Sequence, residues 1–260
     1  MKAAANEQGG LARRAALHAA LADPGRLAIV DALSWGEASP SELAARLGMT
    51  SNLLAHHLNV LAQVGLVTRH RSEGDRRRSY VALVRVTLDT LTRAGAPHAT
   101  GAPQAAQRVV FVCTHNSARS QLAAAMWNTT SPVPATSAGT HPAAQVHPGA
   151  VAVARRRHLS LVPTPPRHLS DVLDPADLIV TVCDSAHEEL ATDQLAAQHA
   201  AGHDGRVALH WSIPDPVRTG EPAAFDRVVN ELTDRITRVA PAVQTPPAAP
   251  ATAGRDRRTP

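Results

Sequence analysis

Hydrophobic and polar positions follow a helical period through most of the first hundred residues. Apolar residues recur every three or four positions in residues 11–22, 27–33, 42–47, 52–64 and 84–93, which predicts five helices. Ser39-Pro40 followed by Glu42 is a typical helix start, and Gly48 is a typical helix end. Two strand-like runs, LVTRHR and RSYVAL, precede the last helix and are separated by SEGD. The order predicts a mostly helical winged helix-turn-helix domain with a β-hairpin wing over residues 10–94.

The second half of the chain has a different pattern, in which short apolar runs alternate with helical segments. The runs RVVFVC, VPATSAGT, DLIVTVC and RVALHW predict four strands, and a helical segment follows each of them. Short apolar strands that alternate with helices favour a parallel sheet with helices on both faces. The pattern therefore predicts an α/β domain with a four-stranded parallel sheet and flanking helices over residues 108–240.

Two segments have no apolar period. Residues 95–107, GAPHATGAPQAAQ, are rich in Gly, Pro and Ala and are predicted to be a linker between the two domains. Residues 241–260 are similar in composition and are predicted to be a disordered tail.

Composition and charge fit two modules with different partners. Apolar residues make up 44% of the chain, which is enough for two cores, although aromatic residues make up only 2%. Residues 1–100 hold 12 basic and 8 acidic side chains, whereas residues 108–240 hold 11 and 13. The basic first module favours a nucleic-acid partner. No signal peptide and no apolar run long enough to span a membrane is found, so we expect no membrane partner, a cytoplasmic location and reduced cysteines.

The second helix of the helix-turn-helix pair and the wing carry the candidate DNA contacts. These are Ser51, Asn52, His56 and His57 on the helix, and Arg69, Arg71, Arg76, Arg77 and Arg78 on the hairpin. Polar side chains on such a helix can bond base edges, and arginines on a wing can neutralise phosphates. Adjacent helical residues do not share a face, so His56 and His57 are interpreted as DNA contacts and not as metal ligands.

The stretch SPSELAARLGMTSNLLAHHLNVLAQVGLVTRHRSEGDRRRSYVAL resembles the ArsR family of bacterial repressors, and the resemblance covers roughly residues 10–95. It implies a homodimer that binds a palindromic operator in double-stranded DNA. Arsenic-sensing members of that family usually carry a cysteine pair near the third helix. This segment has no cysteine, so direct capture of arsenite by thiolates is not expected here.

Chemically distinctive residues follow the predicted strands of the second module. Cys113 ends the first strand, Cys183 ends the third, and Asp215 lies just beyond the fourth. Because ligands of such folds bind at the carboxyl ends of the strands, we expect these three side chains to converge there.

The loop between Cys113 and the next helix predicts an oxyanion site. It consists of Thr114, His115, Asn116, Ser117, Ala118, Arg119 and Ser120. A loop that enters a helix N-terminus directs successive N–H groups at an anion, and Arg119 can bind two of its oxygens. Cys113, held as a thiolate with help from Ser120, would attack the central atom, and Asp215 would protonate the departing oxygen. Asn116 is expected to bond the loop's own backbone.

The motifs VVFVCTHNSARSQLAAAMW, TSAGTHP, DLIVTVCDSA and HWSIPDP resemble the low-molecular-weight tyrosine phosphatase fold, and more closely its arsenate reductase branch, over roughly residues 108–240. The resemblance implies that Cys113 is the nucleophile, Arg119 the oxyanion ligand and Asp215 the general acid. It also places Cys183 where the reductases keep their first resolving cysteine. Phosphatases of this fold have an aromatic residue after the Asp-Pro pair, and Val217 stands there instead.

The sequence departs from the reductases at two positions, and both departures limit which cysteines can take part in the reduction. Leu190 stands where thioredoxin-coupled members usually have a further cysteine, and Ala118 stands where some relatives have another, so a three-cysteine relay cannot operate. Two routes stay open: Cys183 attacks the sulfur of a Cys113–arsenic adduct, or a small external thiol attacks the arsenic. The external reductant would be thioredoxin, or mycothiol with mycoredoxin.

The sequence therefore predicts a bifunctional protein in which a DNA-binding transcriptional regulator is fused to a thiol-dependent arsenate reductase. It predicts no bound cofactor and no metal site, because His141, His147 and His203 lack metal-like spacing. Two alternatives remain: a phosphatase of the low-molecular-weight tyrosine phosphatase type, and a repressor that senses an oxyanion with little turnover.

Overall fold

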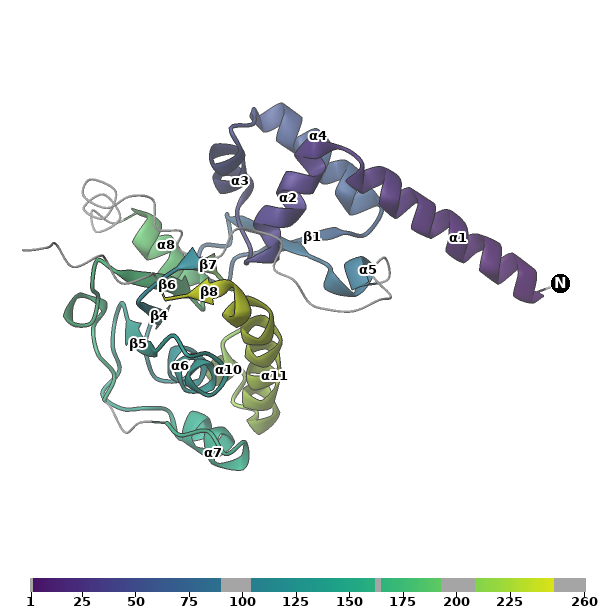
Figure 1. Cartoon of the computed structure of the whole chain (residues 1–260). Helices are drawn as coiled ribbons and strands as arrows, with labels where there is room; N and C mark the ends of the chain where they lie inside the picture. Colours follow the sequence, from purple (N-terminus) through teal and green to yellow (C-terminus); the bar gives the residue numbers. More distant parts are fainter. Residues whose placement is uncertain (1, 90–103, 162–164, 193–208, 246–260) are drawn as a thin grey trace, which may run out of the picture.

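A computed structural model describes residues 2–89, 104–161, 165–192 and 209–245 of the chain. They form a mostly helical domain with a β-hairpin and an α/β domain, so the predicted fold class is confirmed (Figure 1). Most of the predicted linker (residues 95–103) and of the predicted tail (residues 246–260) lies outside the described residues.

The first domain holds five helices and one hairpin among the described residues. They are α1 (Lys2–Leu21), α2 (Pro24–Ser34), α3 (Pro40–Leu47), α4 (Ser51–Gln63), β1 (Val67–Arg71), β2 (Ser79–Leu83) and α5 (Arg85–Asp89). The Ser39 hydroxyl accepts from the N–H of Glu42, and the Glu42 carboxylate accepts from the N–H of Ser39, so the capping box that begins α3 is confirmed. Gly48 ends α3 at a φ of 62°, which favours glycine.

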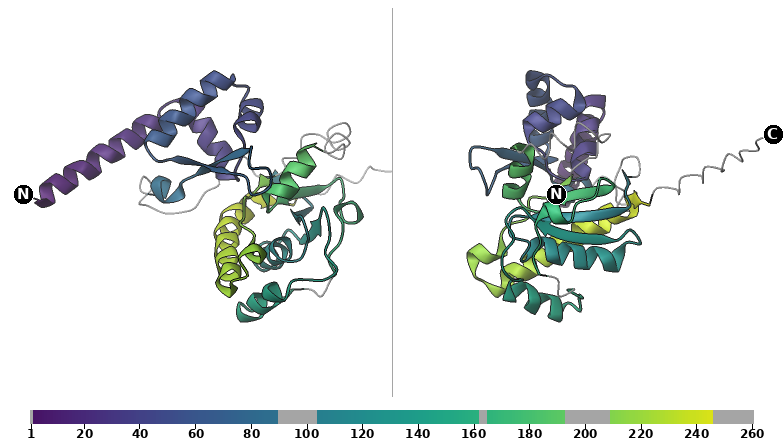
Figure 2. Two further views of the ribbon diagram at one scale, coloured as in Figure 1. Left: turned by 180° about the vertical axis from the view of Figure 1, so that it is seen from behind. Right: turned by 90° about the vertical axis from the view of Figure 1, so that its left-hand side faces the viewer.

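Helices α3 and α4 are the helix-turn-helix pair, and β1 and β2 form the wing. The two strands pair antiparallel from Val67 opposite Leu83 to Arg71 opposite Ser79. The wing tip is the connecting segment, residues 72–78. It lies against the second domain, where the N–H groups of Glu73 and Asp75 donate to Asp184 and Glu188 (Figure 2).

The second domain is built on a parallel sheet with the strand order β5-β4-β6-β7. The strands are β4 (Arg108–Cys113), β5 (Ala135–Gly139), β6 (Asp177–Thr181) and β7 (Leu209–His210). The helices and 3-10 turns are α6 (Arg119–Thr130), α7 (Pro148–Arg156), η1 (Leu169–Asp171), α8 (Asp184–Thr192), α10 (Pro216–Thr219), α11 (Pro222–Val239) and η2 (Ala240–Ala242). Helices α6, α7 and α11 lie on one face of the sheet and α8 lies on the other (Figures 1 and 2), so the predicted parallel sheet with helices on both faces is confirmed.

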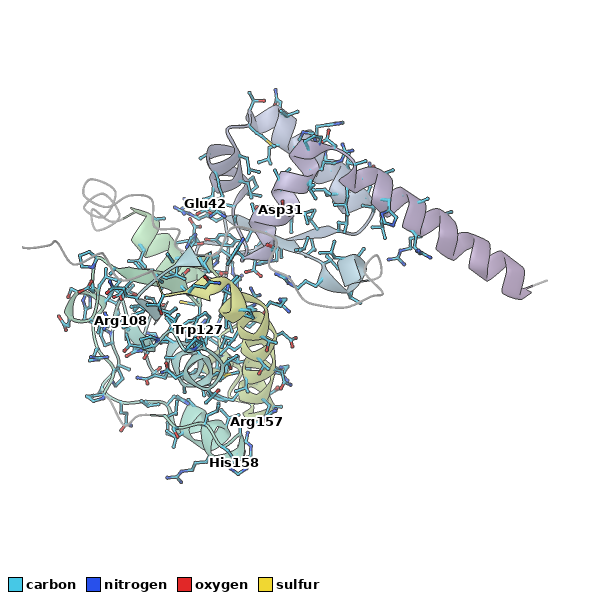
Figure 3. The ribbon with its side chains drawn as sticks, viewed as in Figure 1. Asp31, Glu42, Arg108, Trp127, Arg157 and His158 are labelled. Carbon is cyan, nitrogen blue, oxygen red and sulfur yellow. The ribbon has the colours of Figure 1, made fainter. Side chains whose placement is uncertain are left out.

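Three of the six Phe, Trp and Tyr residues fill the centre of the second domain. Phe111 of β4 packs against Trp127 of α6 and against Trp211, with ring centroids 5.7 Å apart in each pair. All three side chains are buried (Trp127 is labelled in Figure 3). Their contacts therefore hold β4 against α6 and against the residue that follows β7.

A short parallel pair extends the second domain beyond the predicted bounds. Strand β3 (Gln104–Ala105) pairs with β8 (Val243–Gln244). The sequence assigned the first to the linker and the second to the tail. Ala106 and Val243 are buried in the domain core, and this burial explains why both segments are ordered.

The turn between α2 and α3 is bound directly to the second domain. The backbone N–H of Glu37 donates to the His210 carbonyl oxygen, and the Trp211 indole N–H donates to the Trp35 carbonyl oxygen, each at 2.9 Å. The buried Glu37 carboxylate accepts two hydrogen bonds of 2.7 Å from Arg235 of α11. Burial alone would raise the pKa of Glu37, but the charge and hydrogen bonds of Arg235 hold it below its usual value. The domains are therefore joined by a buried ion pair.

A second link joins α3 to α8. The Nε2–H of His187 donates to the Glu42 carboxylate at 2.9 Å, and Glu42 points from α3 toward the second domain (Figure 3). Burial alone would raise the pKa of Glu42, but the hydrogen bond and charge of His187, with the N–H of Ser39, lower it to about 2. Glu42 thus stabilises both the start of α3 and the contact between the domains.

Replacement of Arg235 by Met should lower the free energy of unfolding by about 3–5 kcal/mol, because the buried Glu37 carboxylate would lose its partner. Urea unfolding followed by circular dichroism measures the change. The matched control is Arg227→Met, whose partner Glu221 is exposed, and its effect should stay below about 1 kcal/mol. Equal effects of the two variants would contradict this account of the interface.

Acid should weaken the link through Glu42. Because its pKa falls from an ordinary 4.5 to about 2 on folding, its contribution to stability is complete above pH 4.5 and disappears as the pH falls toward 2. The Glu42→Gln variant keeps an oxygen for the Ser39 N–H but has no charge to titrate. Thermal unfolding of both proteins from pH 6 to pH 2 should show a difference that shrinks below pH 4.5; a constant difference would contradict the prediction.

Candidate functional site

Cys113 lies at the carboxyl end of β4, at the floor of the loop that leads into α6. It is 2% exposed, and its Sγ is 3.1 Å from the Ser120 hydroxyl oxygen. The Asn116 amide N–H donates to that same hydroxyl oxygen at 2.9 Å. The Ser120 hydroxyl thus accepts from Asn116 and has its own hydrogen available for the Cys113 sulfur.

The loop from Cys113 to Arg119 is held open from outside by residues 140–147. The carbonyl oxygens of Cys113, Thr114, His115 and Ser117 accept hydrogen bonds of 2.7–3.2 Å from the backbone N–H groups of Thr140, His141, Ala143 and His147. In a trans peptide the next N–H points away from the carbonyl oxygen, so the loop N–H groups face the other way. Within the described part of the chain, no backbone N–H from Thr114 to Arg119 donates to another protein group. Free N–H groups at a helix start suit an anion.

Asn116 does not bond the loop's own backbone, so that expectation is wrong. Its φ of 48° turns the chain sharply, and its side chain is buried. The side-chain oxygen accepts from the backbone N–H of Arg167 at 3.0 Å and from the Gln121 amide at 3.4 Å, while the amide N–H reaches Ser120. Because the loop carbonyls are already occupied by residues 140–147, Asn116 instead ties the loop to the segment before η1.

Arg119 and Asp215 meet across the loop, as the predicted convergence of strand ends requires. An Arg119 guanidinium nitrogen is 3.2 Å from an Asp215 carboxylate oxygen, and another donates to the Ile213 carbonyl oxygen at 3.0 Å. Burial lowers the pKa of Arg119, but nearby acidic groups, Cys183 and Cys113 foremost, raise it above its usual value. Arg119 is therefore a permanent cation beside Cys113.

Cys183 lies beside the same loop, at the start of α8. Its Sγ is 3.5 Å from the Thr114 hydroxyl oxygen, and it is 2% exposed. Burial raises the pKa of the Cys183 thiol, and the charge of Arg119 opposes this effect without cancelling it. The structure thus brings together both cysteines, Arg119 and Asp215, with Cys183 held in its thiol form.

The other loop positions differ in exposure. His115 is exposed, Thr114 and Ser117 are partly buried, and Ala118 and Ser120 are buried. The sequence assigned all of them to the oxyanion site. Their side chains supply the Thr114 contact to Cys183 and the Ser120 contact to Cys113, so the remaining positions would act through their backbone.

All but one of the side chains predicted to contact DNA are exposed or partly exposed. Exposed side chains are Ser51, Asn52 and His56 on α4, and Arg69, Arg71, Arg76 and Arg77 on the wing; Arg78 is partly exposed. His57 is 7% exposed, with Nδ1 3.7 Å from the Asp23 carboxylate, and it packs beside Gly25. His57 therefore belongs to the α2–α4 packing and not to the exposed surface, because adjacent helical positions point about 100° apart and His56 takes the exposed one.

Glu73 of the wing tip is at the site and had no signal in the sequence. Its carboxylate accepts a hydrogen bond of 3.2 Å from the backbone N–H of Asp215, a residue 142 positions away. No local pattern marks it, since its role depends on how the two domains dock.

The described residues contain no group of three or more His, Cys, Asp and Glu side chains placed to hold a metal ion. None of the helices in the described ranges is both long and apolar enough to cross a bilayer.

Comparisons with known proteins point to two families of domain. Residues 108–247 match the model of the family "Low molecular weight phosphotyrosine protein phosphatase", and residues 21–70 match a helix-turn-helix domain model. Arsenate reductase 1 of Bacillus cereus is 32% identical over 141 residues, which cover 51% of this chain and 92% of that protein. Arsenate reductase of Brevibacillus brevis is 33% identical over 141 residues, with the same coverage.

Solved structures of both enzyme types resemble the second domain. An arsenate reductase from Archaeoglobus fulgidus has 30% identity and a TM-score of 0.42, covering 51% of this chain and 98% of its own. The tyrosine phosphatase Wzb from Escherichia coli K30, in complex with sulphate, has 23% identity and a TM-score of 0.45, covering 52% and 97%.

Replacement of Gly139 by Ala should disrupt the loop. A Cβ there would lie 2.7 Å from the Thr114 carbonyl oxygen and 3.0 Å from the Asn116 backbone nitrogen, so the loop would have to move. We expect the affinity for inorganic phosphate, measured by isothermal titration calorimetry, to fall about tenfold or more, since misdirected N–H groups lose charge-assisted bonds. An unchanged affinity would contradict the role assigned to the loop backbone.

Proposed function

The chain belongs to the low molecular weight phosphotyrosine protein phosphatase family through residues 108–247, and from this premise we propose that its second domain reduces arsenate to arsenite while its helix-turn-helix domain binds operator DNA. The observation that carries the proposal is the second buried thiol, Cys183, beside the Cys113 loop. Hydrolysis of a phosphate ester needs one thiol, whereas a two-electron reduction can use a second.

The first step uses the loop and Asp215. Arsenate binds the free N–H groups of the loop. It also replaces Asp215 as the partner of the Arg119 guanidinium, since the two side chains are paired in this structure. The Cys113 thiolate forms a bond to arsenic, and one arsenic–oxygen bond breaks. Asp215 supplies a proton so that the oxygen leaves as water. Arsenic is still pentavalent in the resulting adduct.

The reduction then follows one of two routes. In the internal route, the Cys183 sulfur attacks the Cys113 sulfur after losing its proton. The electron pair of the sulfur–arsenic bond passes to arsenic, which leaves as arsenite, and a Cys113–Cys183 disulfide remains. In the external route, a small thiolate attacks arsenic and the Cys113 sulfur leaves as a thiolate, so arsenic is still pentavalent in the conjugate. A second external thiol then attacks the sulfur of the conjugate, the electron pair of the sulfur–arsenic bond passes to arsenic, arsenite is released and a mixed disulfide remains. Thioredoxin, or mycothiol with mycoredoxin, is the reductant class for regeneration.

Phosphatase activity is the second candidate, because the loop suits phosphate as well as arsenate. The wall for an aryl group is missing, however. Val217 follows Pro216 and is 41% exposed, and Tyr80 packs on His210 with ring centroids 4.7 Å apart, away from the loop. The absence of an aromatic wall favours a small inorganic oxyanion. A repressor that senses the oxyanion with little turnover is the third candidate.

The helix-turn-helix domain supports a role in transcription. The exposed α4 side chains Ser51, Asn52 and His56 would read bases, and the wing arginines would bind phosphates. We expect a homodimer on a palindromic operator and a cytoplasmic location, where thiol reductants are present.

Steady-state arsenate reduction by the wild type, Cys113→Ser and Cys183→Ser, each with a thioredoxin system and a mycothiol–mycoredoxin system, tests the proposal. Cys113→Ser should lower kcat about a hundredfold or more with either reductant, because no adduct can form. Cys183→Ser should be equally damaging if the internal route operates and nearly silent if the external thiol route operates.

Rapid hydrolysis of aryl phosphates without any arsenate reduction would contradict the proposal and favour the phosphatase. Arsenate binding without turnover would favour the sensor. Operator binding measured in parallel, which Cys113→Ser should leave intact, is the control for folding of the variants.

A further inference from the structure

The wing tip of the DNA-binding domain is seated on the two segments that carry Cys183 and Asp215. The backbone N–H of Glu73 donates to the carboxylate of Asp184 at 2.7 Å, and Asp184 is the residue that follows Cys183. The Glu73 carboxylate accepts from the backbone N–H of Asp215 at 3.2 Å. One residue of the wing therefore bridges the start of α8 and the segment that carries the general acid.

Further contacts fix the wing tip in this position. The backbone N–H of Asp75 donates to the Glu188 carboxylate at 2.8 Å, and the Tyr80 hydroxyl donates to the same carboxylate at 3.2 Å. A Cβ at Gly74 would lie 2.6 Å from a Glu188 oxygen and 3.1 Å from the Ser185 Cα, so the backbone approaches α8 more closely than other residues allow. Backbone N–H groups of the wing tip therefore donate to carboxylates of α8. A shift of the wing by one residue along α8 would break these bonds.

The Asp184 carboxylate, which accepts the Glu73 N–H, is charged at neutral pH. Burial would raise the pKa of Asp184, but hydrogen bonds from His210 and Ser212 and the N–H of Glu73 lower it to about 2. Charge-assisted bonds to backbone N–H groups are stronger than neutral ones, so the docked wing tip is held firmly.

The segment that Glu73 holds has its other restraints on either side of Asp215, at the buried Ile213 and at the start of α10. The Asp215 carboxylate is occupied by the guanidinium of Arg119 and the N–H of Val217, and its own N–H goes to Glu73. When an oxyanion takes the guanidinium, the bond to Arg119 is given up. The bond from the Asp215 N–H to Glu73 then acts together with the bond from the Val217 N–H to keep the carboxyl over the anion.

We propose that Glu73 is a positioning residue for the reaction at Cys113: by accepting the N–H of Asp215 it holds the general acid over the bound oxyanion, so that the DNA-binding domain completes the enzyme's active site. The inference rests on the proposed function for the identity of the substrate. The geometric argument is independent of the substrate, because any oxyanion chemistry at Cys113 uses the same acid. A small displacement of a general acid costs much of its contribution, which is why one hydrogen bond matters.

The test compares full-length wild type, Glu73→Ala and Glu73→Gln in arsenate reduction, with Glu221→Ala as the matched control. Glu221 is an exposed carboxylate whose side chain is paired with Arg227 alone within the described residues, so its replacement should leave kcat and KM unchanged. Glu73→Ala should lower kcat about tenfold without raising KM, since Glu73 touches Asp215 and not the anion. Glu73→Gln should restore kcat to within about twofold of wild type, because its amide oxygen still accepts the N–H.

Two results would overturn the inference. The first is a Glu73→Ala kcat equal to that of the wild type. The second is an equal loss of kcat in Glu73→Ala and Glu73→Gln together with a lower unfolding temperature, which would show that the wing only stabilises the fold.

Parallel assays with p-nitrophenyl phosphate separate this inference from the proposed function. If the wild type hydrolyses the ester but does not reduce arsenate, the proposed function fails. The ratio of kcat between Glu73→Ala and Glu73→Gln on the ester then still decides the role of Glu73, because the same cysteine and the same acid act on it.

Discussion

The site depends on one constraint: the carbonyl oxygens of the loop after Cys113 must point away from its centre. Residues 140–147 meet this constraint by donating four backbone N–H groups to those carbonyls. The loop N–H groups are thereby turned toward one point, and the positive φ of Asn116 and the missing side chain of Gly139 follow from the tight fit. Without this external clamp, Cys113 and Arg119 would lie at the end of an ordinary strand-to-helix turn.

The parts that the sequence predicts well are those fixed by neighbours along the chain. Ser39 and Glu42 form the expected capping box because both members lie within one helical turn. Cys113 and Arg119 occupy the expected loop because a buried strand and a helix start enclose it. Asp215 is a longer-range case, and it was found because parallel strands place their carboxyl ends along one edge.

The parts that the sequence could not predict depend on contacts between distant segments. Asn116 bonds Arg167 because the loop carbonyls are taken, and nothing near Asn116 indicates this. His57 turns inward, since the packing of α4 on α2 decides which of two adjacent histidines is buried. Glu73 reaches Asp215 only because the two domains dock against each other, and no local pattern in the sequence encodes that docking.

The buried pair between Glu37 and Arg235 has a consequence for how such fusions can be altered. The pair spans 198 positions of the chain, and each partner is costly to bury alone. Exchanging the second domain for an unrelated reporter, as in building a biosensor, would remove Arg235 and leave Glu37 as an unpaired charge wherever the new domain buried it. The two domains therefore cannot be exchanged independently. A fusion that keeps the DNA-binding domain needs a redesign of residues 35–37 as well as of the segment that joins the domains.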